Sequence, residues 1–112
     1  MNEKRKPKVY IPSKLEHDYS AAAEYGEVVA LTVGHVDKYS VGELSTAIGE
    51  ALRDAQDDDT ILISGLTLNN CIASAIMAHK FGVVNFLLYR RGEYMLRKIL
   101  LSPDDKNLGE QT

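Results

Sequence analysis

The chain has 112 residues, 45 % of them hydrophobic and 26 % charged, and this balance is typical of one globular domain rather than of a disordered chain. Thirteen basic against sixteen acidic residues leave a net charge of −3, which does not supply the concentrated positive field that non-specific binding to duplex nucleic acid needs. The single cysteine, Cys71, has no partner for an internal disulfide, and no apolar run approaches the roughly 18 residues of a membrane span, so we expect a soluble cytoplasmic protein.

Polar segments at both ends frame one predicted domain over residues 9–101. Residues 1–8 carry four lysines and arginines together with a proline, and residues 102–112 are polar, with Pro103 near their start. Such compositions are typical of terminal tails. We therefore predict an N-terminal tail, a single domain and a C-terminal tail.

The first half of the domain is predicted to hold two strands and a helix. Residues 9–11 form a short apolar run before a proline, which indicates an edge strand. The segment 13–16 (SKLE) matches a capping box, and Asp18 stands before Tyr19 and an alanine run at 21–23 that stops at Gly26, so one or two short helical turns are expected here. Residues 27–33 are apolar nearly throughout and predict a central strand covered on both faces. A second capping box at 40–43 and apolar positions at helical spacing predict a helix over residues 41–56.

The second half predicts an alternation of strand and helix that closes with a hairpin. Residues 60–64 are a β-branched and apolar run, which indicates another buried strand. Residues 68–81 have apolar residues at helical spacing, Cys71 among them, which predicts a second helix and a buried, inert thiol. Residues 83–89 predict a further strand, and residues 94–101 predict its antiparallel partner.

Together these elements predict a small Rossmann-like α/β layer fold with a mainly parallel sheet and a C-terminal antiparallel hairpin. The strands at 27–33, 60–64 and 83–89 are expected to be parallel neighbours, with both helices packed on them. The residues expected in the core are Ile48, Leu52, Ile61, Ile63, Ile72 and Ile76.

Ligands of such sheets bind beyond the carboxyl ends of the parallel strands, and three loops qualify as a binding site. These loops hold Gly34 and His35, residues 64–70, and the pair Arg90 and Arg91. The helix start in the middle loop offers unpaired N–H groups to an anion, and the arginines can pair with phosphate oxygens. The candidate ligand-binding residues are Gly34, Ser64, Gly65, Thr67, Asn69, Asn70, Arg90 and Arg91, and the candidate general base is His35.

Each of these residues also has an ordinary structural interpretation. The serine and glycine at 64–65 fit a plain strand-to-helix connection, because neither a G-x-G-x-x-G nor a Walker motif is present. The asparagines fit helix caps, and the arginines fit a soluble hairpin turn. His35 has no visible catalytic partner in the sequence. No spaced set of metal ligands is present either, so we expect neither a metal nor a cofactor.

Two segments resemble known proteins. The sequence DYSAAAEYGE at 18–27, which leads into VVALT, resembles small proteins of unknown function encoded in tailed-phage genomes. That resemblance implies a small accessory protein that acts by binding in the host cytoplasm. The sequence ISG at 63–65, followed by AHKF at 78–81, resembles CRISPR-associated ring nucleases with CARF-like folds, which implies binding and cleavage of cyclic oligoadenylate.

Three hypotheses for the function follow. The first is an accessory protein that binds an anionic, nucleotide-like ligand, such as a phosphate-bearing small molecule, at the carboxyl ends of the parallel strands. The second is a ring nuclease or other phosphodiesterase with His35 as general base. The third is a pure protein-interaction module. For all three, the apolar strands of the terminal hairpin predict a symmetric homodimer.

Overall fold

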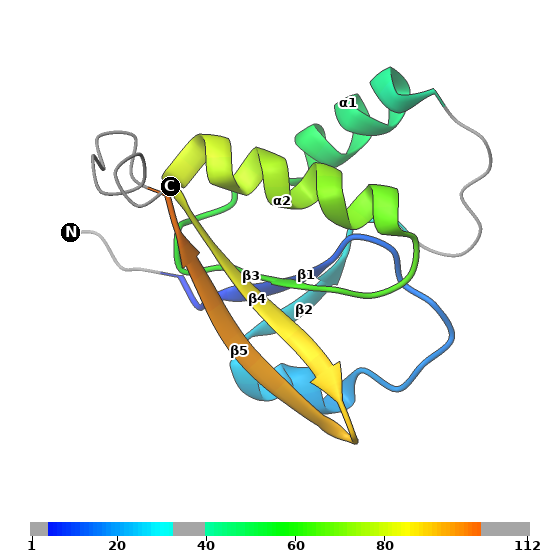
Figure 1. Cartoon of the computed structure of the whole chain (residues 1–112), viewed down its shortest axis with the longest axis vertical. Coiled ribbons are helices and arrows are strands. Elements are labelled where there is room, and N and C mark those ends of the chain that lie inside the picture. Colours follow the sequence, from blue (N-terminus) through cyan, green and yellow to red (C-terminus); the bar gives the residue numbers. More distant parts are fainter. Residues whose placement is uncertain (1–4, 33–39, 102–112) are drawn as a thin grey trace, which may run out of the picture.

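A five-stranded sheet carries two α-helices on one face and a short 3₁₀ helix on the other (Figure 1). The computed structural model describes residues 5–32 and 40–101. In chain order the elements are β1 (Lys8–Ile11), the 3₁₀ helix η1 (Ser20–Tyr25), β2 (Glu27–Ala30), α1 (Val41–Ala51), β3 (Thr60–Leu62), α2 (Thr67–Phe81), β4 (Val83–Arg90) and β5 (Glu93–Leu100).

The strand order is β2-β1-β3-β4-β5, with the first four strands parallel and β5 antiparallel to β4. The mostly parallel α/β sheet and the C-terminal antiparallel pair are therefore confirmed. The prediction that 27–33 and 60–64 are neighbours is wrong, because β1 lies between β2 and β3. Val9, Tyr10 and Ile11 are all buried, as a strand flanked and covered on every side requires. In contrast β2, predicted as central, is an edge strand.

Two residues from the predicted N-terminal tail take part in the fold. Lys8 begins β1, and its N–H donates to Asp59 Oδ1 at 2.9 Å. The guanidinium of Arg5 donates to both oxygens of the same carboxylate, at 3.0 and 2.7 Å. The Asp59 side chain is fully buried and also accepts from the Gln56 N–H at 2.8 Å. This carboxylate therefore ties the start of β1 to the loop that leads into β3.

The ends of the helices follow local capping chemistry. Ser40 caps α1 through its hydroxyl, which accepts from the Glu43 N–H at 3.1 Å, as the capping box predicts. The helix ends at Ala51 and not near residue 56, and Leu52 then forms its C-cap. At the other helix, Gly82 adopts a left-handed conformation and its N–H donates to the Ala78 carbonyl, which ends α2 as predicted.

The connections between strands run in opposite directions from the middle of the sheet, and we call this point the switch in strand order. The link from β1 to β2 runs through η1 on one face. The links from β2 to β3 and from β3 to β4 run through α1 and α2 on the opposite face (Figure 1). Connections therefore leave β1 and β3 in opposite directions, and the carboxyl ends of these two strands flank the switch.

The core lies mainly between the sheet and the two α-helices. Ile48, Leu52 and Ile61 have no exposed surface, as predicted. Three other predicted core residues, Ile63, Ile72 and Ile76, are only partly buried. Ile63 lies one residue beyond the end of β3, where the sheet no longer covers it on both sides.

The orientation of α2 explains why Ile72 and Ile76 are only partly buried. Its buried positions are Asn69, Asn70, Ala73 and Met77, so the helix is turned by about one residue from the orientation that its apolar side chains predict. Leu68 is 44 % exposed, and Cys71, predicted to be a core thiol, is exposed as well. Polar side chains occupy the start of the buried face because they make hydrogen bonds within the fold.

Candidate functional site

The loops that follow β1 and β3 meet at the switch in strand order. Gly65 has a φ of 74°, and a side chain at this position would overlap the Ser13 hydroxyl and lie 2.5 Å from the Ser13 carbonyl oxygen. The Leu66 N–H donates to Ser13 Oγ at 3.1 Å. The two loops are therefore in direct contact at the switch, the place where open α/β sheets commonly bind ligands. The short helical turns predicted in this region are confirmed as η1, but the capping box at 13–16 does not start them, because Ser13 Oγ accepts from this distant loop instead.

Two of the predicted ligand-binding residues, Ser64 and Asn70, hold this connection in place. Asn70 Oδ1 accepts from the Ser64 N–H at 3.2 Å, and Asn70 Nδ2 donates to the carbonyls of Ser64 and Leu66 at 2.9 and 2.7 Å. The Ser64 hydroxyl lies 2.6 Å from the Tyr19 hydroxyl, which also accepts from the Leu15 N–H at 3.1 Å. The polar atoms of both side chains are therefore engaged within the protein.

The first turn of α2 contains a buried acceptor that lacks a donor. Asn69 is 1 % exposed, and its Nδ2 donates to Thr32 Oγ1 at 3.1 Å and to the Pro12 carbonyl at 3.4 Å. Its Oδ1 is buried and has no hydrogen-bond partner among the described residues. Leu66, at the N-cap, provides no side-chain cap, and the first turn has no acidic residue. The amino end of α2 therefore presents uncapped N–H donors next to exposed Thr67.

Arg90 and Arg91 lie in the hairpin between β4 and β5. Arg91 and Gly92 have φ values of 53° and 83°, as in a two-residue type I′ turn. Because Leu62 pairs with Leu87, β4 continues past the end of β3 by roughly 10 Å, at about 3.4 Å per residue. Figure 1 shows this turn projecting beyond the rest of the sheet, apart from the amino end of α2.

The structure therefore divides the predicted site residues into groups. One group shares the connection between β3 and α2 and consists of Ser64, Gly65, Thr67, Asn69 and Asn70. Arg90 and Arg91 form a second group in the hairpin, whereas Gly34 and His35 lie outside the described residues. The sequence reasoning missed Ser13, Tyr19 and Thr32, the partners that bind the first group.

An aromatic row joins the loop after β1 to the hairpin. The His17 ring contacts those of Tyr19 and Tyr89 edge-on, with centroids 4.7 and 5.2 Å apart. The ring of Tyr89 in turn contacts Tyr94 at 5.0 Å. Burial raises the pKa of the Tyr94 phenol, so this group stays neutral at physiological pH. These contacts fix the hairpin against the body of the domain.

The outer side of β5 is an open edge of the sheet within the described part of the chain. The Leu101 N–H donates to the Gly82 carbonyl at 2.7 Å, which makes these two residues a hydrogen-bonded pair. Bonded and non-bonded pairs alternate along an antiparallel ladder, so every second residue of β5 directs its N–H and C=O outward. These outward residues are Tyr94, Leu96, Lys98 and Leu100. Two outward carbonyls already accept from side chains of the same chain: the Tyr94 carbonyl from the Tyr25 hydroxyl at 3.5 Å, and the Leu96 carbonyl from the Arg97 guanidinium at 3.0 Å.

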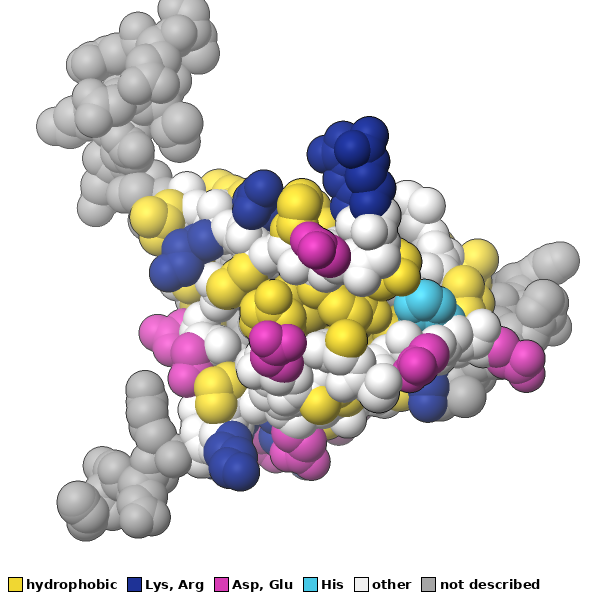
Figure 2. Space-filling model, turned by 90° about the horizontal axis from the view of Figure 1, so that it is seen from below, with side chains coloured by type: hydrophobic (Ala, Val, Ile, Leu, Met, Phe, Trp, Pro, Cys, Tyr) yellow, Lys and Arg dark blue, Asp and Glu magenta, His cyan; other side chains and the backbone are white. Residues whose placement is uncertain are grey.

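Apolar side chains of β5 are exposed to solvent. Leu96 is 49 % exposed, Ile99 48 % and Leu100 73 %. Apolar side chains also gather at the centre of the face seen in Figure 2, with charged side chains around them. Single exposed leucines are common on protein surfaces, whereas here several exposed apolar side chains share one edge strand.

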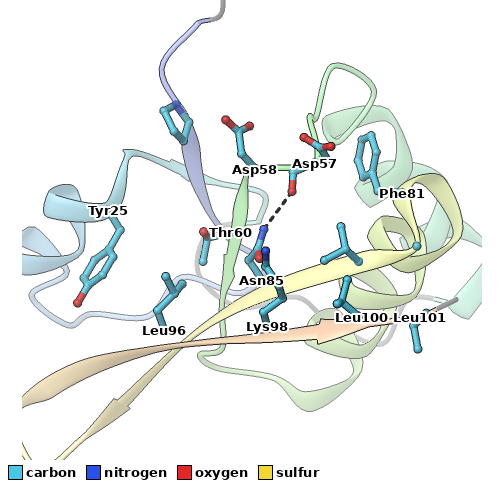
Figure 3. Close-up of a pocket in the computed structure, with 13 residues that line it drawn as sticks. Tyr25, Asp57, Asp58, Thr60, Phe81, Asn85, Leu96, Lys98, Leu100 and Leu101 are labelled. Carbon is cyan, nitrogen blue, oxygen red and sulfur yellow. Dashed lines mark hydrogen bonds between the residues drawn. The ribbon is translucent and has the colours of Figure 1, made fainter.

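A groove of about 680 Å³ lies beside β5 on the sheet face opposite α1 and α2. The strands contribute Asn85, Leu96 and Leu100 to it, and the loop before β3 contributes Asp57 and Asp58 (Figure 3). Asn85 Nδ2 donates to the Asp57 carbonyl at 3.0 Å. Asp58 Oδ1 is buried without a hydrogen-bond partner in the described ranges. The strands therefore line the groove with both leucines and the polar side chains of Asn85 and Lys98, and the loop is acidic.

A comparison with known families covers most of the chain. The model of the family described as Phage Pam3 gp32-like protein matches residues 4–103. The chain belongs to the phage Pam3 gp32-like protein family. This finding confirms the resemblance to phage proteins. No curated protein and no solved structure matches the chain, and the resemblance to CARF-like ring nucleases is not shown by any of these comparisons.

The described residues show neither a metal-binding cluster nor a membrane-spanning helix. Over residues 5–32 and 40–101, histidine, cysteine and acidic side chains form no group of three or more that could hold a metal ion. None of the helices in these ranges is long and apolar enough to cross a membrane.

Proposed function

We propose that this protein is an interaction module that works by self-assembly, with β5 as its contact strand. The observation that carries the proposal is β5 itself, an eight-residue edge strand with exposed leucine and isoleucine side chains. A long edge strand offers a row of unpaired backbone groups to another strand. Pairing would satisfy these groups and also remove apolar surface from water.

A second copy of the same chain is the partner that fits this edge best. The opposite edge of the sheet is β2, which has four residues against the eight of β5. A contact between β5 of one copy and β2 of the next joins two different edges, so it would extend into an open chain. A contact between two β5 strands uses the same edge of both copies and closes as a two-fold dimer.

We expect the protein to have the mass of a dimer in sedimentation equilibrium. Leu96→Asp should raise the dimer dissociation constant by at least about tenfold, because a charge would then be buried at the contact. Leu68→Asp is the matched control, since Leu68 is exposed to a similar degree on α2. It should leave the mass unchanged. A wild-type monomer at the highest concentration measured would overturn the proposal.

A second candidate function is binding of an anionic, nucleotide-like ligand at the amino end of α2. The observation that favours it is that uncapped N–H donors lie in the same turn as Asn69 Oδ1, a buried acceptor with no donor among the described residues. A nucleotide carries phosphate oxygens that would complement the N–H donors. Rossmann-like sheets and other open α/β sheets bind such ligands at the carboxyl ends of their strands, which supports this location.

Calorimetry at low salt with phosphate, mononucleotides and cyclic oligonucleotides tests this candidate. Thr67→Glu should weaken binding by repulsion, without loss of stability, because an acidic residue in the first turn stabilises a helix. Thr46→Glu is the control, because Thr46 is exposed on α1, and it should not affect binding. A panel in which nothing binds would remove the candidate. Cleavage of a cyclic oligonucleotide that is lost in His35→Ala would instead support the ring-nuclease alternative.

A further inference from the structure

We infer that two copies of this chain pair β5 against β5 in antiparallel, with the two-fold axis at Met95 and with Glu93 of each copy opposite Arg97 of the other. This geometry rests on the proposed self-assembly and specifies its register. It follows from the outward backbone groups of β5 and from the order of the charges along it, which form no ion pair with one another or with other described residues.

The alternation of side chains along β5 limits where the axis can lie. Odd-numbered residues of β5 pair with Val84 and Phe86, which pack against the α-helices, whereas Leu96 and Leu100 face the groove. Residues directly opposite each other in an antiparallel pair lie on the same face of the sheet. A two-fold axis perpendicular to the sheet therefore passes through a residue position and not between two positions.

The charges of β5 distinguish the remaining registers. A residue on the axis lies opposite its own copy, so an axis at Arg97 or at Lys98 would bring two like charges together. An axis at Leu96 would place Arg97 opposite Met95 and Glu93 opposite another apolar residue. None of these registers lets a charge of β5 meet an opposite charge.

An axis at Met95 pairs residues 93–97 of the two copies and satisfies the charges, with Ile99 and Leu100 beyond the paired segment. Glu93 then lies opposite Arg97 twice, once on each side of the axis, on the helix side of the sheet. On the groove side, Tyr94 lies opposite Leu96 in the same way. Opposite-charge pairs and aromatic–aliphatic pairs both stabilise antiparallel strands.

Glu93 and Arg97 are available for this contact. Both are exposed, and the ion pairs found over the described residues are Arg5–Asp59 and Arg53–Glu50. The Arg97 guanidinium reaches only the Leu96 carbonyl at 3.0 Å and the Met95 sulfur at 3.9 Å, both on its own strand. Pairing with a second copy would therefore break no ion pair among the described residues.

Charge reversal tests the register. Glu93→Arg and Arg97→Glu should each raise the dimer dissociation constant by at least about tenfold, because two attractions become two repulsions. The double variant should return to within about threefold of the wild type. Lys98→Glu is the matched control, with the same change of charge on the adjacent residue, which lies opposite Gly92 in this register. It should have little effect.

Disulfide trapping gives a second measurement on the same register. In a Cys71→Ser background, Met95→Cys should form a covalent dimer on oxidation, and Leu96→Cys should not, because only the residue on the axis meets its own copy. If neither charge reversal changes the dimer dissociation constant, or if Leu96→Cys forms the covalent dimer instead, the register is wrong but self-assembly stands. A wild-type monomer overturns both.

Discussion

Replacing Asp59 by alanine is expected to lower the free energy of unfolding by about 3–5 kcal/mol, because it breaks a buried ion pair and leaves the other donors without an acceptor. The carboxylate accepts from the Arg5 guanidinium and from the N–H groups of Lys8 and Gln56. Urea denaturation of the variant measures the loss. Asp57→Ala is the control, because Asp57 lies two residues away and its side chain is exposed. It should change the free energy of unfolding by no more than about 0.5 kcal/mol.

The same carboxylate predicts how stability depends on pH. Burial by itself would raise the pKa of Asp59, but the hydrogen bonds from Arg5, Gln56 and Lys8 outweigh it and hold the pKa below its ordinary value. A lowered pKa in the folded state contributes stability that is fully present above the unfolded pKa of about 3.9 and is lost as the pH falls through the folded value. Below about pH 4, the wild type should therefore lose stability more steeply than Asp59→Ala. Parallel pH profiles of the two proteins would contradict this role.

The kinds of element could be predicted from the sequence, but the position of β1 could not. Periodicity locates both α-helices, a capping box marks the start of α1, and β-branched runs locate β3 and β4. The length of the apolar run then favoured residues 27–33 as the central strand over the shorter 9–11. In the structure the shorter strand is the buried one: Val9 and Ile11 have no exposed surface, whereas Glu27 is exposed. Strand order depends on pairing over long separations in the chain, which a local pattern does not contain.

The predicted site shows the same limit at the level of single side chains. The sequence places Asn69 and Asn70 at a helix start, and both the cap and the ligand interpretation fit that position. The structure engages Asn70 with the local turn, whereas Asn69 donates to Thr32 and Pro12 from the opposite half of the fold. Ser13 was missed because its hydroxyl accepts from Leu66, which is 53 residues away. Nothing in either local sequence indicates that contact.

Gly65→Ala is expected to lower the free energy of unfolding by about 2–5 kcal/mol, through a strained φ and an overlap with the loop after β1. At a φ of 74°, an L residue is disfavoured whatever its surroundings. The added methyl group would also lie 2.5 Å from the Ser13 carbonyl oxygen, so the two loops would have to separate. Thermal or chemical denaturation measures the change.

Gly92→Ala separates the two causes of this loss. Gly92 also has a positive φ, 83°, but a methyl group there meets nothing within 4 Å, so it should cost only the backbone term of about 1–2 kcal/mol. The difference between the two variants then reports the contact with Ser13. Equal losses would show that the loops can move apart freely and that the crevice at the switch in strand order is open to a ligand. A larger loss at Gly65 would mean that the fold itself occupies this crevice, which favours the β5 edge as the working surface of the protein.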